Sequence, residues 1–143
     1  MLVALIAAAA CHAGAVADRS CTPGAHFHAP AKQVCVSGWS KRHRHVTAAQ
    51  RHRIFARYDI SYARHHHYEL DHLIALEIGG NNSDSNLWPE PLTGSHGAHA
   101  KDRQENSAKR AVCSGHMSLA TAQRQMVARW TRRYRPGAER PTF

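Results

Sequence analysis

The stretch "YELDHLIALEIGGNNSDSNLWPEP", residues 68–91, constrains the fold more than any other part of the chain. Residues 68–76 alternate between apolar and polar side chains well enough to predict a β-strand. "GGNNSDSN" is a turn sequence, and "NLW" then predicts a second short strand that the two following prolines end. The first strand carries two adjacent polar residues, Asp71 and His72, and such residues are costly in a half-buried strand unless they serve a purpose.

Three other segments predict helices. Thr47 is a suitable N-cap for a helix over "AAQRHRIFARY". A second helix is predicted from about His99 to Val112, where Glu105 and Lys109 have the i,i+4 spacing of an ion pair. Ser118 can cap a last helix, whose apolar stripe predicts core packing and consists of Leu119, Ala122, Met126, Val127 and Trp130.

The remaining segments predict less regular structure. Residues 18–45 are rich in Pro, Gly and Ser and predict an irregular arm with one strand candidate, "QVCVSGW". "SYARHHH" predicts a loop, and "RYRPGAERPTF" predicts a basic tail. The whole pattern indicates one small α+β domain, without internal repeats.

The N-terminus "MLVALIAAAACHAGAVA" predicts a secretory signal peptide over residues 1–17, with an A-x-A type cleavage site that ends at Ala17. No Lys or Arg precedes the apolar run, which departs from the usual pattern. The run is too short and too rich in alanine to span a bilayer, so we expect no stable membrane insertion. "AAAC" at Cys11 leaves a degenerate lipoprotein site as an alternative. The expected mature domain is 18–143, in a secreted or periplasmic location.

Three cysteines remain after such cleavage: Cys21, Cys35 and Cys113. In an oxidising compartment we expect two of them to pair and one to be left over. The sequence does not decide which two pair. A zinc site is the rival interpretation, but no C-x-x-C pair supports it.

The chain is strongly basic, with a formal net charge of +9 and 13 histidines that add positive charge in mildly acidic medium. This balance favours a polyanionic partner such as nucleic acid, DNA before RNA, or an anionic envelope surface. No segment resembles a base-reading module, so we expect contacts to phosphates with little sequence specificity. The candidate contact residues are Lys101, Arg103, Arg132, Arg133 and Arg135.

The order of these elements is a strand with Asp-His, a Gly-rich loop, an Asn before a short strand, and a helix. With "ELDHLIALEIGGNNSDSNLWPEP" and "AHAKDRQEN", the chain resembles the HNH endonuclease superfamily, and more narrowly a group of small secreted bacterial proteins with an HNH-like core. "CTPG", "CVSGW", "VCSGHMSLATAQ" and a closing Trp130 also match that group. The resemblance covers most of residues 18–143 and implies a ββα-metal core at about 68–113, with flanking helices.

The resemblance also implies roles for individual residues. His72 would be the general base, and Asp71 on the opposite-facing position would reach the metal. Asn86 would tie down the loop and hold the His72 ring in the correct tautomer. For the second metal ligand, the position nine residues after the motif Asn is a serine, which departs from the family pattern. His99 is the favoured candidate, and the alternatives are Asp102 and Asn106.

The cofactor that this ligand set implies is a divalent metal, with Mg²⁺ first and Mn²⁺ or a transition metal as alternatives. The expected function is a secreted, metal-dependent endonuclease that hydrolyses phosphodiester bonds of DNA or RNA. Two rivals stay open. One is a catalytically inactive cationic protein that binds nucleic acid or the envelope. The other is a His-rich metal-binding protein of the periplasm, to which "HHH" at 65–67 would contribute.

Overall fold

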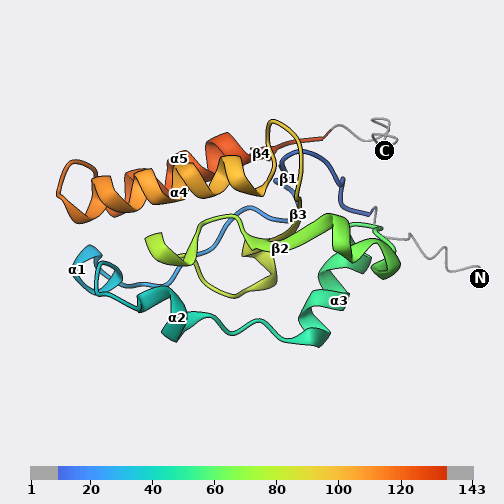
Figure 1. The fold of residues 1–143 in the computed structure, drawn as a ribbon, viewed down its shortest axis with the longest axis horizontal. Helices are drawn as coiled ribbons and strands as arrows, with labels where there is room; N and C mark the ends of the chain where they lie inside the picture. Colours follow the sequence, from blue (N-terminus) through green and yellow to red (C-terminus); the bar gives the residue numbers. More distant parts are fainter. Residues whose placement is uncertain (1–9, 135–143) are drawn as a thin grey trace, which may run out of the picture.

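The computed structural model describes residues 10–134, and within them the chain is of the α+β class (Figure 1). The helices are α1 (Ala31–Val34), α2 (Trp39–His43), α3 (Ala48–Arg57), α4 (Ala98–Cys113) and α5 (Leu119–Trp130). The strands are β1 (Ala17–Asp18), β2 (Tyr68–His72), β3 (Leu87–Pro91) and β4 (Thr131–Arg132). Short 3₁₀ helices are η1 (Tyr62–His67), η2 (Leu76–Ile78) and η3 (Asp84–Asn86).

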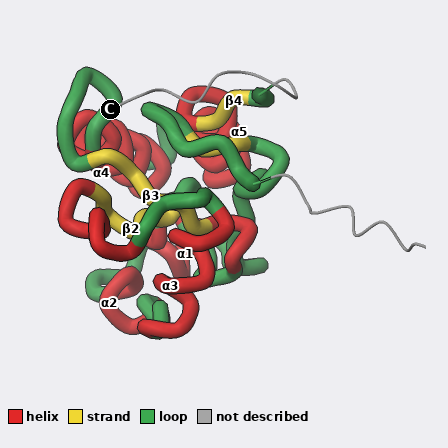
Figure 2. Tube along the Cα trace, turned by 90° about the vertical axis from the view of Figure 1, so that its right-hand side faces the viewer, coloured by secondary structure: helices red, strands yellow, loops and turns green. Residues whose placement is uncertain are grey.

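The centre of the fold is the antiparallel pair β2–β3, in which His72 lies opposite Leu87 and Tyr68 lies opposite Pro91. In both views the pair lies between α4 and α5 on one side and the smaller helices α2 and α3 on the other (Figures 1 and 2). Tyr68, Leu70 and His72 are buried, whereas Glu69 and Asp71 between them point to the opposite face. The predicted alternation is confirmed, and it places the side chains of Asp71 and His72 on opposite faces of the sheet.

The two strands differ in length from the prediction. β2 ends at His72 instead of residue 76, because the next backbone groups bond to Asn86: Leu73 N donates to its carbonyl (2.8 Å) and Ile74 N to its side chain (2.9 Å). β3 is longer than predicted and contains Pro89. In a two-stranded sheet each strand has an open edge, where a proline lacks no hydrogen bond.

The loop between the strands closes tightly on itself at the Gly-Gly pair. A Cβ atom at Gly80 would lie only 1.7 Å from the carbonyl oxygen of Ile74, so no other residue fits there without moving the backbone. Gly79 has a φ of +84°, in the left-handed region, and ends η2. The glycines therefore let the chain turn back directly behind the Asp71–His72 pair.

The three predicted helices are present. Thr47 caps α3 by accepting from Gln50 N (3.0 Å), and Ser118 caps α5 by accepting from Thr121 N (3.1 Å). α4 and α5 lie side by side and run in opposite directions (Figure 1). The stripe of α5 packs into the core, with the following side chains buried: Ala122, Met126 and Trp130.

Three local predictions were wrong. Glu105 pairs with Lys101, one turn earlier in α4, whereas Lys109 Nζ donates to the carbonyl of Val34 (2.7 Å). "QVCVSGW" forms no strand, since its first residues end α1 and Trp39 begins α2. The helical turn buries Val34 completely, which a solvent-facing arm would not do. "SYARHHH", predicted as a loop, forms η1.

Residues 10–17, part of the predicted signal peptide, are built into this fold. Cys11 forms a disulfide with Cys21 and donates its backbone N–H to the carbonyl of Arg57 (2.9 Å). Ala17 is fully buried and begins β1, which pairs with β4 in parallel. Cys35 and Cys113 form the other disulfide, so all four cysteines are paired. Cleavage after Ala17 would leave Cys21 without a partner.

Among residues 10–134, none of the helices combines the length and the apolar character needed to cross a bilayer. The C-terminal end of the predicted basic tail, including Arg135, lies outside the described residues.

A chain that begins at Asp18 is expected to be less stable than one that begins at Ala10. A disulfide that closes a loop of about ten residues stabilises a fold by roughly 2–3 kcal/mol. Urea unfolding of the two chains measures the difference, and a thiol assay should find one free thiol in the shorter chain and none in the longer. The double variant Cys11→Ala/Cys21→Ala of the longer chain separates the bond from the packing of residues 10–17. Equal stability of the two chains would contradict this account of the segment.

Candidate active site

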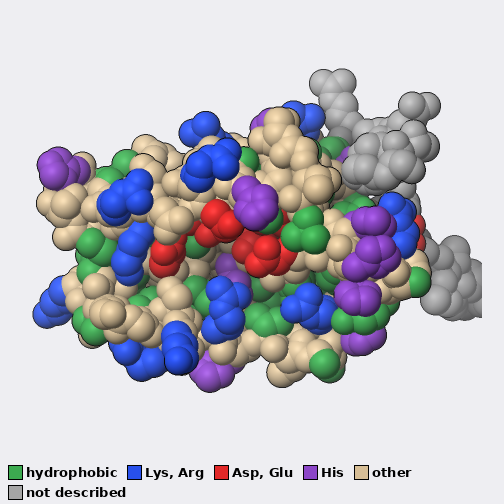
Figure 3. All heavy atoms as spheres, viewed as in Figure 1, with side chains coloured by type: hydrophobic (Ala, Val, Ile, Leu, Met, Phe, Trp, Pro, Cys, Tyr) green, Lys and Arg blue, Asp and Glu red, His purple; other side chains and the backbone are tan. Residues whose placement is uncertain are grey.

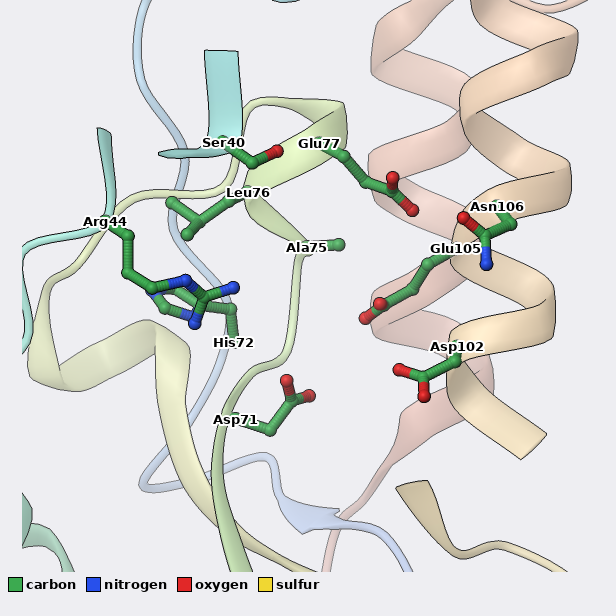
Figure 4. Close-up of a pocket in the computed structure, with 10 residues that line it drawn as sticks. All are labelled: Ser40, Arg44, Asp71, His72, Ala75, Leu76, Glu77, Asp102, Glu105 and Asn106. Carbon is green, nitrogen blue, oxygen red and sulfur yellow. The ribbon is translucent and has the colours of Figure 1, made fainter. Parts of the chain in front are cut away.

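A cavity of about 270 Å³ opens where the end of β2 meets α4, and carboxylates from both elements line it. Figure 4 shows the carboxylates on one side of the cavity and Arg44, His72 and Ser40 on the other. On the molecular surface, Asp and Glu side chains gather at the centre of this face, with Lys and Arg above and below them (Figure 3). The full lining is Ser40, Arg44, Asp71, His72, Ala75, Leu76, Glu77, Asp102, Glu105 and Asn106.

The strand register explains why further carboxylates meet beside this cavity. Residues directly opposite each other in an antiparallel pair share one face of the sheet. Glu69 lies opposite Glu90, and Asp71 lies opposite Trp88, so three carboxylates occupy the face that meets α4. Without a cation among them, three carboxylates this close would repel one another strongly.

Lys101 of α4 supplies that cation, and its side chain is fully buried. Its ammonium donates to Asp71 Oδ2 (2.6 Å), to the backbone carbonyl of His72 (2.8 Å) and to the carboxylate of Glu105. Burial by itself would lower the pKa of Lys101, but the charges of Asp71 and Glu105 raise it above its usual value. The lysine is therefore charged, with all three of its N–H donors bonded.

Glu90 is the carboxylate of this cluster whose burial is least offset by hydrogen bonds. Its side chain is 2% exposed, and Oε1 has no hydrogen-bond partner among the described residues. Burial, followed by the charge of Asp71, raises the pKa of Glu90 to about 9, although Lys101 acts in the opposite direction. Burial also raises the pKa of Glu105, to about 7. At neutral pH Glu90 is thus a protonated, neutral acid.

His72 has the opposite character. It is 1% exposed, and burial lowers the pKa of its imidazole, so the ring is neutral at pH 7. Nε2 lies 3.1 Å from Asn82 Oδ1, whereas the buried Nδ1 has no hydrogen-bond partner within the part of the chain that is described. Which nitrogen carries the proton therefore depends on the orientation of the Asn82 amide.

That orientation follows from the neighbours of Asn82. Its amide nitrogen donates to the carbonyl of His43 (2.7 Å), which can only accept. Its amide oxygen accepts from the backbone N–H of His45 (3.2 Å), which can only donate. Oδ1 must then accept from His72 as well, and Nε2 of His72 carries the proton. His72 Nδ1 then carries the lone pair, and this nitrogen is buried.

Asn86 performs half of the role predicted for it. It is fully buried, and its amide bonds to both backbone groups of Ile74 and donates to the carbonyl of Asn81 (2.9 Å), so it ties down the loop. It has no hydrogen bond to His72, however, because its amide is fully occupied by backbone groups. The residue that orients His72 is Asn82, which was not predicted because it stands in the sequence as a second Asn of an ordinary turn run.

The candidate metal ligands are placed unequally. Asp71, Asp102 and Asn106 line the cavity, whereas the favoured His99 lies in the first turn of α4, is exposed, and does not line it. Within residues 10–134, no three His, Cys, Asp or Glu side chains are arranged to hold one metal ion. One or two carboxylates with waters and substrate phosphate are nevertheless a common Mg²⁺ environment. The cavity offers carboxylates of that kind, so its donor set fits a hard divalent cation.

The predicted nucleic-acid contacts also divide. Arg103, Arg132 and Arg133 are exposed, as such contacts require, and Arg135 lies outside the described residues. The prediction that Lys101 contacts nucleic acid was wrong, because a fully buried ammonium with three partners cannot reach a phosphate. Arg44, an exposed residue that lines the cavity, belongs to the basic cluster "KRHRH", which the sequence offers as a phosphate contact without distinguishing Arg44 from its neighbours.

Compared with protein-family models, with curated proteins and with solved structures, the chain matches none. Its resemblance to the HNH superfamily, and the site roles that follow from it, therefore stay predictions.

Replacing Glu90 with Gln is expected to stabilise the protein increasingly as the pH rises from about 5 to about 9. The pKa of Glu90 is about 9 in the folded state and 4.5 in the unfolded state. The wild type therefore loses stability as the pH rises from the unfolded value to the folded value, because only the unfolded chain releases the proton there. A glutamine side chain cannot ionise and should remove this loss. Urea unfolding of both proteins at pH 5, 7 and 9 measures the difference.

Glu69→Gln is the matched control, since Glu69 lies directly opposite in the sheet but is exposed. It should change the pH dependence much less. A stability difference between Glu90→Gln and the wild type that is constant with pH would show that Glu90 is ionised throughout.

Proposed function

We propose that the protein is a metal-dependent endonuclease that hydrolyses phosphodiester bonds, with His72 as its general base. The observation that carries this proposal is the hydrogen-bond chain from His43 through Asn82 to His72, which leaves a neutral imidazole with a free Nδ1. A structural histidine usually has both nitrogens bonded or solvated. A neutral ring with one nitrogen held and the other unbonded can act as a general base once water reaches the unbonded nitrogen, which is buried here.

The mechanism requires that substrate binding admits a water molecule to the buried Nδ1 of His72. This nitrogen would then accept a proton from the water, whose oxygen attacks the phosphorus. A new P–O bond then forms, and the bond to the departing sugar oxygen breaks. A divalent cation, when bound at Asp71 with Asp102 or Asn106, would offset negative charge on the phosphate and the leaving oxygen. Asp71 Oδ2 is bound to Lys101, so the other carboxylate oxygen is the one available to such a cation.

Arg44 fits the role of a phosphate-binding residue in this site. It is exposed, lines the cavity on the same side as His72, and lies across from the carboxylates (Figure 4). A guanidinium there can bind phosphate oxygens bidentately. The Lys and Arg side chains around the acidic centre would attract a polyanion without reading its bases, which supports low sequence specificity (Figure 3).

Export is part of the proposal. Two disulfides, one between residues 35 and 113, are typical of oxidising compartments. We place the end of the signal peptide before Cys11 instead of after Ala17, because Cys11 is bonded to Cys21 and Ala17 is fully buried. The location would be secreted or periplasmic, with nucleic acid as the partner.

One observation favours a second candidate, a catalytically inactive cationic protein that binds nucleic acid. A lysine ammonium already neutralises part of the acidic cluster, and the described residues contain no three-ligand metal group. An inactive protein would still bind DNA in a salt-dependent manner, so only cleavage separates the two candidates.

His72→Ala is expected to lower the rate of plasmid cleavage by roughly 10²–10⁴, the usual contribution of a general base, while DNA binding stays nearly unchanged. EDTA should abolish cleavage by the wild type, and Mg²⁺ or Mn²⁺ should restore it. His66→Ala, which removes an exposed histidine away from the cavity, is the control and should keep wild-type rates. Cleavage that persists unchanged in EDTA or in His72→Ala would refute the mechanism. No cleavage by the wild type with any divalent metal would favour the inactive binding protein.

Arg44→Ala is expected to weaken binding and to slow cleavage more than Arg42→Ala, because only Arg44 lines the cavity. Arg42 is an exposed arginine two residues earlier whose side chain donates to the carbonyl of Ser37 (3.0 Å). The comparison therefore removes one positive charge from the same segment in both variants. Losing one phosphate contact should also reduce the slope of log K against log salt by about one. Equal effects of the two substitutions would mean that Arg44 contributes only general charge.

A further inference from the structure

The role of Lys101 is not explained by neutralising the acidic cluster alone. A lysine is almost never fully buried unless it is paired, and this one has three partners. Two of the partners are the Asp71 side chain and the backbone carbonyl of His72, which belong to the two adjacent residues at the centre of the proposed site. One ammonium group thus contacts both of them from α4.

We propose that Lys101 is the positioning residue of the site: its ammonium holds the Asp71 carboxylate and the His72 backbone in a fixed arrangement against α4. The catalytic consequence rests on the proposed function, but the positioning itself does not. His72 is the last residue of β2, and β3 and Asn86 hold its backbone from the side of the sheet and the loop. The bond from Lys101 Nζ to the His72 carbonyl adds a restraint from α4.

The contacts of the neighbouring side chains support this role. The His72 ring is held by Asn82 at one nitrogen only, so its position also depends on the backbone that carries it. Asp71 Oδ2 has Lys101 as its hydrogen-bond partner, at 2.6 Å. Glu105, the third partner, lies one turn along the same helix and keeps the lysine side chain extended along α4. Without Lys101, the end of β2 would lose its polar contacts to the helix.

The test compares Lys101→Met with Lys109→Met, a second lysine of α4 whose ammonium bonds to the carbonyl of Val34, away from the proposed catalytic residues. We expect Lys101→Met to lower kcat about 100-fold, the usual effect of a small misplacement of reacting groups, with KM changed less than about threefold. A crystal structure of Lys101→Met should show the Asp71 carboxylate and the His72 backbone displaced from α4, and Lys109→Met should show neither effect.

Removal of one partner from a buried ion pair is destabilising, so folding is checked by near-UV circular dichroism. If Lys101→Met does not fold, the double variant Lys101→Met/Glu105→Gln, which leaves one carboxylate fewer unpaired, is compared with Glu105→Gln in the same measurements. A folded variant without Lys101 that keeps kcat and the positions of the Asp71 carboxylate and the His72 backbone would overturn the inference.

A crystal structure of the variant needs no catalysis, so the two proposals can fail separately. If the wild type cleaves no nucleic acid, the proposed function fails, and a displaced Asp71 carboxylate and His72 backbone in the lysine variant would still support the positioning role. If the wild type cleaves and both groups keep their places in the variant, the nuclease stands and the positioning role falls.

Discussion

The ion contacts of Lys101 join the two halves of this small protein. On one side is the β2–β3 pair with carboxylates on its outer face, and on the other is α4 (Figures 1 and 2). A charged ammonium is costly to bury, and only its full set of partners makes it tolerable. Without the lysine, in turn, the carboxylates of Asp71 and Glu105 would repel each other strongly. The packing of the helix on the sheet therefore depends on this contact, and so does the geometry at the end of β2.

Two asparagines of the connecting loop complete the arrangement on the opposite face. Asn86 uses its whole amide for bonds to backbone groups and so gives the loop a definite path. Asn82, placed by that path, bonds to the His72 ring and to the segment that follows α2. Neighbouring residues of β2 thus receive different environments: Asp71 faces an ion cluster, and His72 faces a neutral amide. This division would keep the imidazole neutral beside several carboxylates.

The charge distribution is unusual for a protein with a net charge of +9. Carboxylates from β2, η2 and α4 meet in one cavity, while Lys and Arg side chains lie around it (Figure 3). Such an arrangement is unfavourable for folding alone, as the raised pKa values of Glu69, Glu77 and Glu90 indicate. The cluster therefore raises the energy of the folded state, and the ion pairs of Lys101 offset part of that cost.

The sequence by itself determined the helices with strong caps, the strand that carries Asp71 and His72, and their placement on opposite faces. These features depend on local periodicity and on capping side chains such as Thr47 and Ser118, which act within a few residues. Tertiary structure alone decided the rest: the pairing of Cys11 with Cys21, the burial of Lys101, the bond of Asn82 to His72, and the exclusion of His99 from the cavity lining. Each of these contacts either joins segments that are distant in the sequence or depends on which side of a helix packs against the sheet. Neither can be inferred from residue type and local spacing.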